Sequence, residues 1–68
     1  SLPDYEILEM LLFNSIARKD TKDLAKQLIN HFGSLIEVII ADKGRLEKIK
    51  GIGQHTIFQF KLLQDLFS

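Results

Sequence analysis

The sequence predicts an all-α fold, a small bundle of five helices in one domain. Apolar residues recur three and four positions apart through most of the chain, which is the period of a helix. Residues that stop and start helices separate these stretches, most clearly Gly33 followed by Ser34. The chain has 68 residues, of which 46% are hydrophobic, so it can bury one small core.

The first helix is expected over residues 3–17. Pro3 suits a first helical position, where its missing N–H would have no partner in any case. Three acidic residues follow within the first turns, where they would favour the positive end of the helix dipole. Arg18 and Lys19 are expected to end this helix.

The second helix is expected to start at a cap formed by Asp20 or Thr21 and to run to about Phe32. Gly33 then predicts its end, and Ser34 is a typical cap for the helix that follows. The predicted buried face of the second helix is Leu24, Ala25, Leu28, Ile29 and Phe32.

Two short helices and a longer one complete the prediction, over residues 35–40, 45–49 and 54–67. The first of these has β-branched residues typical of a strand, but nothing else in the chain could pair with it, so a helix is favoured. Asp42 is the expected cap of the second. The apolar residues available for burial in the last helix are Ile57, Phe58, Leu62, Leu63 and Leu66.

Composition excludes several classes of function. The chain has no cysteine, which rules out disulfides and thiolate metal sites. Nine basic and nine acidic side chains cancel, which argues against a strongly basic nucleic-acid module and against a polybasic membrane binder. The uncharged runs, among them residues 10–17, are at most ten residues long and too short to span a membrane, so the expected location is the cytoplasm. We predict no catalytic residue, metal ligand or cofactor, because no suitable cluster surrounds His31 or His55.

The segment of residues 46–57 carries the most informative motif. Two glycines, Gly51 and Gly53, flank Ile52 between a short helix and a long one. Free N–H groups at the start of the last helix would point outward and, with the helix dipole, could bind a phosphate. This arrangement resembles the helix-hairpin-helix motif, which binds the DNA backbone. The alternative stays open that the glycines only form a tight turn packed by Ile52.

The charges near this motif also favour an anion. Residues 43–50 hold four basic side chains against the single acid Glu47. Contacts to phosphates position a protein without reading the bases, so binding would be weak and independent of sequence. The predicted phosphate-binding residues are Lys48, Lys50, Gly51, Ile52, Gly53, Gln54 and His55.

A second, degenerate hairpin is predicted at His31, Phe32, Gly33 and Ser34. Two such hairpins would pack about a pseudo-twofold axis and could grip two phosphates. An ordinary capped turn is the favoured explanation of the same four residues.

The order of motifs resembles the N-terminal domain of the RadC-like family, bacterial proteins labelled as DNA repair proteins. The distinctive pieces are the runs 24–25, 31–35 and 51–53 (LA, HFGSL and GIG), and the resemblance covers essentially all of the chain. It implies a paired helix-hairpin-helix (SAM/HhH-like) domain at residues 1–68, cut from a longer protein. It also implies a C-terminal metalloprotease-like domain with a His-x-His zinc signature, which does not occur in this sequence, so any hydrolase activity would lie in that absent domain.

A different function is also consistent with the sequence. The first helix is apolar on more than one face, so the chain could be a protein-interaction or dimerisation module. Its partner would be its own C-terminal domain or a second copy. The predicted interface residues are Ile7, Met10, Leu11 and Phe13. The neutral net charge favours this interaction hypothesis. The lack of a cation after Gly53 also favours it, because helix-hairpin-helix motifs often carry a lysine there.

Overall fold

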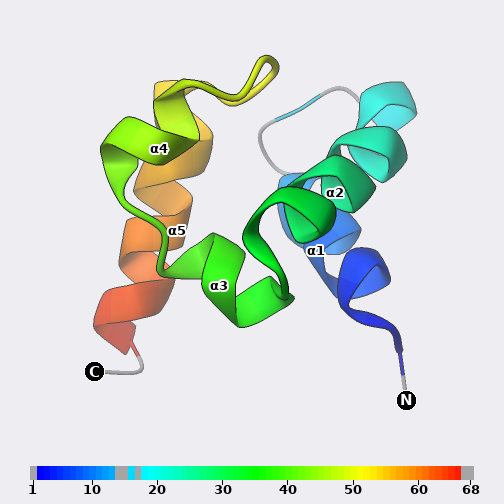
Figure 1. Ribbon diagram of the computed structural model, residues 1–68, viewed down its shortest axis with the longest axis horizontal. Helices are drawn as coiled ribbons and strands as arrows, with labels where there is room; N and C mark the ends of the chain where they lie inside the picture. The colour runs from blue at the N-terminus through cyan, green and yellow to red at the C-terminus, as the bar shows by residue number, and fades with distance from the viewer. Residues whose placement is uncertain (1, 14–15, 17, 67–68) are drawn as a thin grey trace.

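The computed structural model describes residues 2–13, 16 and 18–66, and it contains five helices there (Figure 1). The described residues form no strand, so the all-α prediction is confirmed, including the helix in place of a strand after Ser34. The helices are α1 (Asp4–Leu12), α2 (Arg18–Phe32), α3 (Leu35–Ile39), α4 (Lys43–Glu47) and α5 (Gln54–Leu66).

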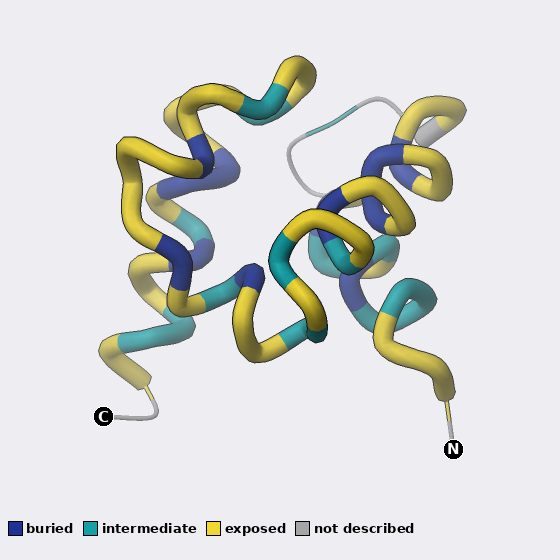
Figure 2. Tube along the Cα trace, viewed as in Figure 1, coloured by how far each residue is buried: buried dark blue, intermediate teal, exposed yellow. Residues whose placement is uncertain are grey.

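The helices form two groups that meet at α3. Helices α1 and α2 pack on each other on one side of the molecule, α4 and α5 pack on each other on the opposite side, and α3 lies between them (Figure 1). The buried positions of these helices face the interior in Figure 2. The apolar residues of the core are Leu8, Leu12, Leu24, Ala25, Leu28, Val38, Ala41, Leu46, Ile57 and Phe60.

Helix α1 is shorter than predicted. It ends at Leu12, with Phe13 as its cap, and the N–H of Ile16 still donates to the Leu12 carbonyl at 3.0 Å. The predicted helical positions 14, 15 and 17 lie outside the described residues. At the other end Pro3 is the N-cap rather than the first helical residue.

Helix α2 begins earlier than predicted. It starts at Arg18, so Arg18 and Lys19 belong to its first turn and do not end α1. Asp20 lies in that first turn, and Thr21 is fully buried inside the helix rather than capping it. Position 21 continues the apolar stripe of α2 one turn toward the N-terminus, which is why the helix includes it. Gly33 has φ of 112° and ends α2 as predicted.

Two further predictions need correction. Helix α4 lies two residues before its expected range, and Asp42 stands at its N-cap without making a side-chain hydrogen bond. In α5 the fully buried apolar residues are Ile57 and Phe60, whereas Phe58, Leu62 and Leu66 are 60%, 53% and 74% exposed. A helix that packs on one side buries only one face, and Phe60 rather than its neighbours occupies that face.

Candidate nucleic-acid interface

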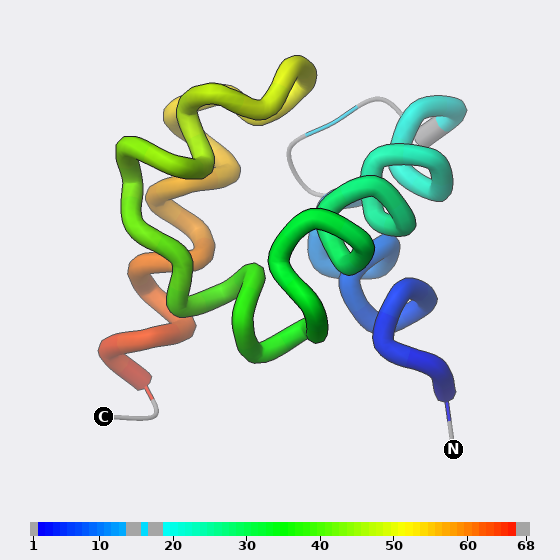
Figure 3. Tube along the Cα trace, in the orientation of Figure 1, coloured from blue at the N-terminus to red at the C-terminus, as the bar shows by residue number. Residues whose placement is uncertain are grey.

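The α4–α5 hairpin, residues 48–53, has the turn that its glycines predict. Gly51 has φ of 98°, which only glycine adopts without strain. The N–H of Ile52 donates to the Ile49 carbonyl at 3.2 Å, and the Ile52 side chain packs against the core. Figure 3 shows this hairpin on the side of the molecule away from the start of α1 and the end of α5. Ile52 therefore packs the turn against the core.

The bond made by Ile52 changes the predicted set of phosphate-binding amides. Its N–H already has a protein acceptor, so it cannot also point at a ligand. For Gly51, Gly53 and Gln54, no hydrogen bond from the backbone N–H to a described residue is found. The amides of Gly53 and Gln54 precede the first intrahelical bond of α5, in which Ile57 donates to the Gly53 carbonyl at 3.2 Å.

The two glycines of the hairpin have different surroundings. A Cβ on Gly51 would lie 3.5 Å from Cδ2 of Leu24, so this glycine makes the turn and rests on α2. A Cβ on Gly53 would meet nothing within 4 Å, and its φ is not positive. Gly53 is therefore not required by the backbone or by packing. It leaves open space in front of the first turn of α5.

Basic residues lie near this open space in the sequence. Lys48, Lys50 and His55 are all exposed. Opposing them, the Glu47 carboxylate accepts a hydrogen bond from Nε2 of Gln54 at 2.8 Å, which holds a negative charge beside the start of α5. The hairpin is thus basic in balance but carries an acid of its own at the place where a phosphate would bind.

The predicted basic run does not all face the hairpin. The guanidinium of Arg45 lies 4.8 Å from the centre of the Phe32 ring, a cation–π contact that joins α4 to α2. The Phe32 ring also packs edge to face on His31, at 4.7 Å between the ring centres. Arg45 is therefore partly engaged in holding the two groups of helices together.

The α2–α3 hairpin, residues 31–34, is present as a helix–turn–helix, but the first and third amides of α3 are occupied. The Ser34 hydroxyl accepts the N–H of Glu37 at 3.2 Å, the N-cap that the sequence predicted. The Asp4 carboxylate, contributed by α1, accepts the N–H of Leu35 at 2.9 Å. A carboxylate of the protein already stands where this hairpin would hold a phosphate. The geometry thus favours an ordinary capped turn over a phosphate site at His31, Phe32, Gly33 and Ser34.

The predicted interface on the first helix is only partly exposed. Met10 and Phe13 are 57% and 37% exposed, whereas Ile7 and Leu11 are half-buried and Leu11 packs against the core. The Leu11 carbonyl also accepts Nε2 of Gln59 at 3.0 Å, which ties α1 to α5. Ile7 and Leu11 are thus partly buried in the domain, which leaves Met10 and Phe13 as the exposed residues of the four.

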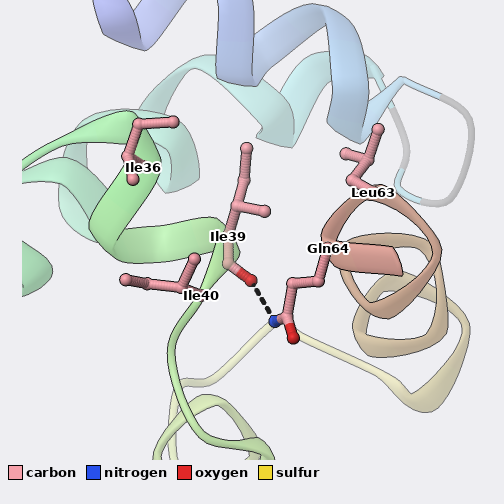
Figure 4. Close-up of a pocket in the computed structure, with 5 residues that line it drawn as sticks. All are labelled: Ile36, Ile39, Ile40, Leu63 and Gln64. Atoms are coloured by element: carbon pink, nitrogen blue, oxygen red, sulfur yellow. Dashed lines mark hydrogen bonds between the residues drawn. The ribbon is translucent and has the colours of Figure 1, made fainter. Parts of the chain in front are cut away.

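A pocket between α3 and α5 was not predicted from the sequence (Figure 4). It has a volume of about 350 Å³, and Gln64 closes part of it by donating from Nε2 to the Ile39 carbonyl. Its lining is otherwise aliphatic: Ile36, Ile39, Ile40 and Leu63. Five apolar residues among the six of the segment 35–40 were a signal for two apolar faces on one short helix.

Two further properties concern the described residues alone. They contain no group of three or more His, Cys, Asp or Glu side chains that could hold a metal ion. None of their helices is both long enough and apolar enough to cross a membrane. The expectations of no catalytic residue, no cofactor and a cytoplasmic location stay predictions.

Comparison with known proteins shows what the chain resembles. It is 45% identical over 64 residues to a UPF0758 protein of Ruegeria pomeroyi and 38% identical over 64 residues to a UPF0758 protein of Rhodobacter capsulatus. These matches cover 94% of this chain but only 29% and 30% of the relatives' lengths. UPF0758 is the RadC family, so the relatives bear the family name that the motifs indicated. No family model and no solved structure matches the chain.

Proposed function

We propose that the chain is the helix-hairpin-helix domain of a RadC-like protein and that its α4–α5 hairpin binds DNA phosphates without reading the bases. The family assignment is supported by the two UPF0758 relatives, whose names state no function. The DNA-binding role is supported by the hairpin itself. We also propose that any hydrolase activity of the longer protein belongs to a C-terminal domain. That domain would lie outside the residues that match the relatives.

One observation carries the proposal. The N–H groups of Gly53 and Gln54 stand at the start of a 13-residue helix and find no acceptor among the described residues, and the space beside Gly53 where a Cβ would lie is open. Such a helix start offers an anion both free donors and the positive end of the helix dipole. A phosphate needs this close approach to the backbone, and glycine at position 53 permits it.

The charges set the strength of binding. Lys48 and Lys50 are the exposed cations of the hairpin, and Glu47 opposes them. With two or three phosphates neutralised, the slope of log affinity against log salt is about −2 to −3. Binding then falls in the weak, non-specific range, with dissociation constants of roughly 10⁻⁴ to 10⁻⁶ M.

A titration with a matched pair of variants tests this function. Gly53→Val fills the open space at the hairpin, whereas Gly44→Val makes the same change in α4, where a Cβ also meets nothing within 4 Å. Fluorescence anisotropy of labelled duplexes of two unrelated sequences, at about 50 and 200 mM salt, reports the affinity. We expect equal binding to both duplexes, loss in Gly53→Val and retention in Gly44→Val. No binding at about 1 mM protein in low salt, or equal loss in both variants, contradicts the proposal.

A protein-contact role is the second candidate, and exposed apolar residues favour it. Large exposed apolar patches usually mark interaction surfaces. On α5 three such residues are more than half exposed, and the chain spans less than a third of its relatives' length, which leaves a covalent partner domain to consider. The exposure of these residues favours α5 over the first helix as the contact surface.

A further inference from the structure

The pocket between α3 and α5 leaves apolar side chains in contact with water. Two of its lining residues, Ile36 and Ile40, are 62% and 53% exposed, while Ile39 and Leu63 are half-buried. Figure 4 shows the isoleucines on one side of the pocket and Leu63 on the other, with the Gln64 side chain at its edge. Removing such surface from water is favourable, so an apolar group that enters the pocket gains free energy.

We propose that this pocket receives an aliphatic or aromatic side chain of the C-terminal domain of the longer protein, which docks across the end of α5. The inference rests on the proposal above that such a domain follows. The lengths of the relatives support this occupant, because more than two thirds of each lies outside the match. The volume of about 350 Å³ falls within the range of pockets that bury a bound group.

The position of the pocket along the chain favours the same occupant. Leu63 and Gln64 belong to the last turn of α5, which ends at Leu66. A domain attached after residue 68 is therefore tethered only a few residues from the pocket. A short tether gives an effective concentration in the millimolar range. A contact with an intrinsic dissociation constant of about 100 µM is then formed about 90% of the time.

Other occupants fit the pocket less well. A twofold pair of copies joins one surface to itself, and a recess cannot fill a second recess. A small ligand is usually oriented by several polar groups. Gln64 is the only polar residue among the five that line the pocket, and its Nε2 already donates to the Ile39 carbonyl.

Cysteine labelling of the longer protein tests the docking. The 68 residues contain no cysteine, so Ile40→Cys places one at the pocket once any cysteine elsewhere in the protein is replaced by serine. Met10→Cys is the matched control, because Met10 on α1 is 57% exposed against 53% for Ile40. We expect Ile40→Cys to react with a maleimide about tenfold more slowly than Met10→Cys. In the 68-residue chain, whose helices circular dichroism checks, the two rates should agree within about twofold.

A polar substitution in the pocket shows whether the protection comes from docking. Ile36→Gln makes one wall polar, so it should release the docked domain and raise the labelling of Ile40→Cys in the longer protein about tenfold. Met10→Gln should leave that labelling slow. No DNA is present, so this result is independent of the phosphate site.

Three results would overturn the proposal. The first is an equal rate for Ile40→Cys and Met10→Cys in the longer protein. The second is protection of Ile40→Cys that persists with Ile36→Gln or in the 68-residue chain. The third is protection that weakens on dilution from about 100 to 1 µM, because a separate molecule rather than a tethered domain would then cover the pocket.

Discussion

The α2–α3 and α4–α5 hairpins share one local plan but differ in what stands at the start of their second helix. Each has a glycine with positive φ in its turn, Gly33 and Gly51. In the α2–α3 hairpin the Asp4 carboxylate accepts the first amide of α3. In the α4–α5 hairpin the first amides of α5 find no acceptor among the residues described, and Glu47 binds only the side chain of Gln54.

The comparison shows that a hairpin turn alone does not define a phosphate site. The turn fixes the direction of the second helix, whereas the site depends on whether another part of the protein already supplies an anion. In this chain the Asp4 carboxylate of α1 binds the first amide at one hairpin, whereas the first amides at the other have no acceptor among the described residues. The predictions below probe this contrast, beginning with the largest expected effect.

The glycines of the α4–α5 hairpin should differ in their effect on stability. Gly51→Ala forces a side chain into φ of 98°, so we expect a loss of about 1–2 kcal/mol in the free energy of unfolding. Gly53→Ala should change it by less than about 0.5 kcal/mol, because its φ is not positive and the space is open. Urea denaturation measures both. Equal losses would show that Gly53 is a structural glycine, and the argument for an open phosphate site would fail.

Removing the Asp4 carboxylate from the α2–α3 hairpin should lower the stability of the domain. Asp4→Ala leaves the Leu35 N–H without its 2.9 Å acceptor, and the loss of such a cap costs about 1 kcal/mol. Asp23→Ala, at an exposed position of α2, serves as the control for losing one acidic side chain. Thermal unfolding of the two variants gives the comparison. Equal melting temperatures would mean that Asp4 does not hold this hairpin.

Neutralising Glu47 should strengthen DNA binding. Glu47→Gln keeps a hydrogen-bond acceptor for Gln54 but removes the negative charge at the start of α5. We expect affinity for duplex DNA to rise about threefold at low salt, with a smaller gain as salt screens the charges. Glu37→Gln on α3 removes an equal charge away from the hairpin and should have less effect. If the affinity of Glu47→Gln were unchanged, the DNA would have to bind a surface other than the α4–α5 hairpin.

Local chemistry made much of the fold predictable. Gly33 and Ser34 act through bonds to residues within four positions, and these are readable from the sequence. The bond from Leu35 to Asp4 joins residues 31 positions apart, and no local pattern indicates it. The exposed face of α5 could not be predicted from the sequence, for a different reason. Its apolar residues cover two faces, and only the packing of α3 and α4 decides that Phe60 is buried while Leu62 is exposed.

The most direct measurement of the central claim is an NMR titration of the ¹⁵N-labelled chain with duplex DNA at low salt. We expect the backbone N–H signals of Gly53 and Gln54 to shift most, together with those of neighbouring hairpin residues. The N–H of Leu35, which Asp4 already binds, should stay unmoved. If Gly53 and Gln54 remain unmoved at about 1 mM DNA, or if Leu35 shifts in their place, the account is wrong.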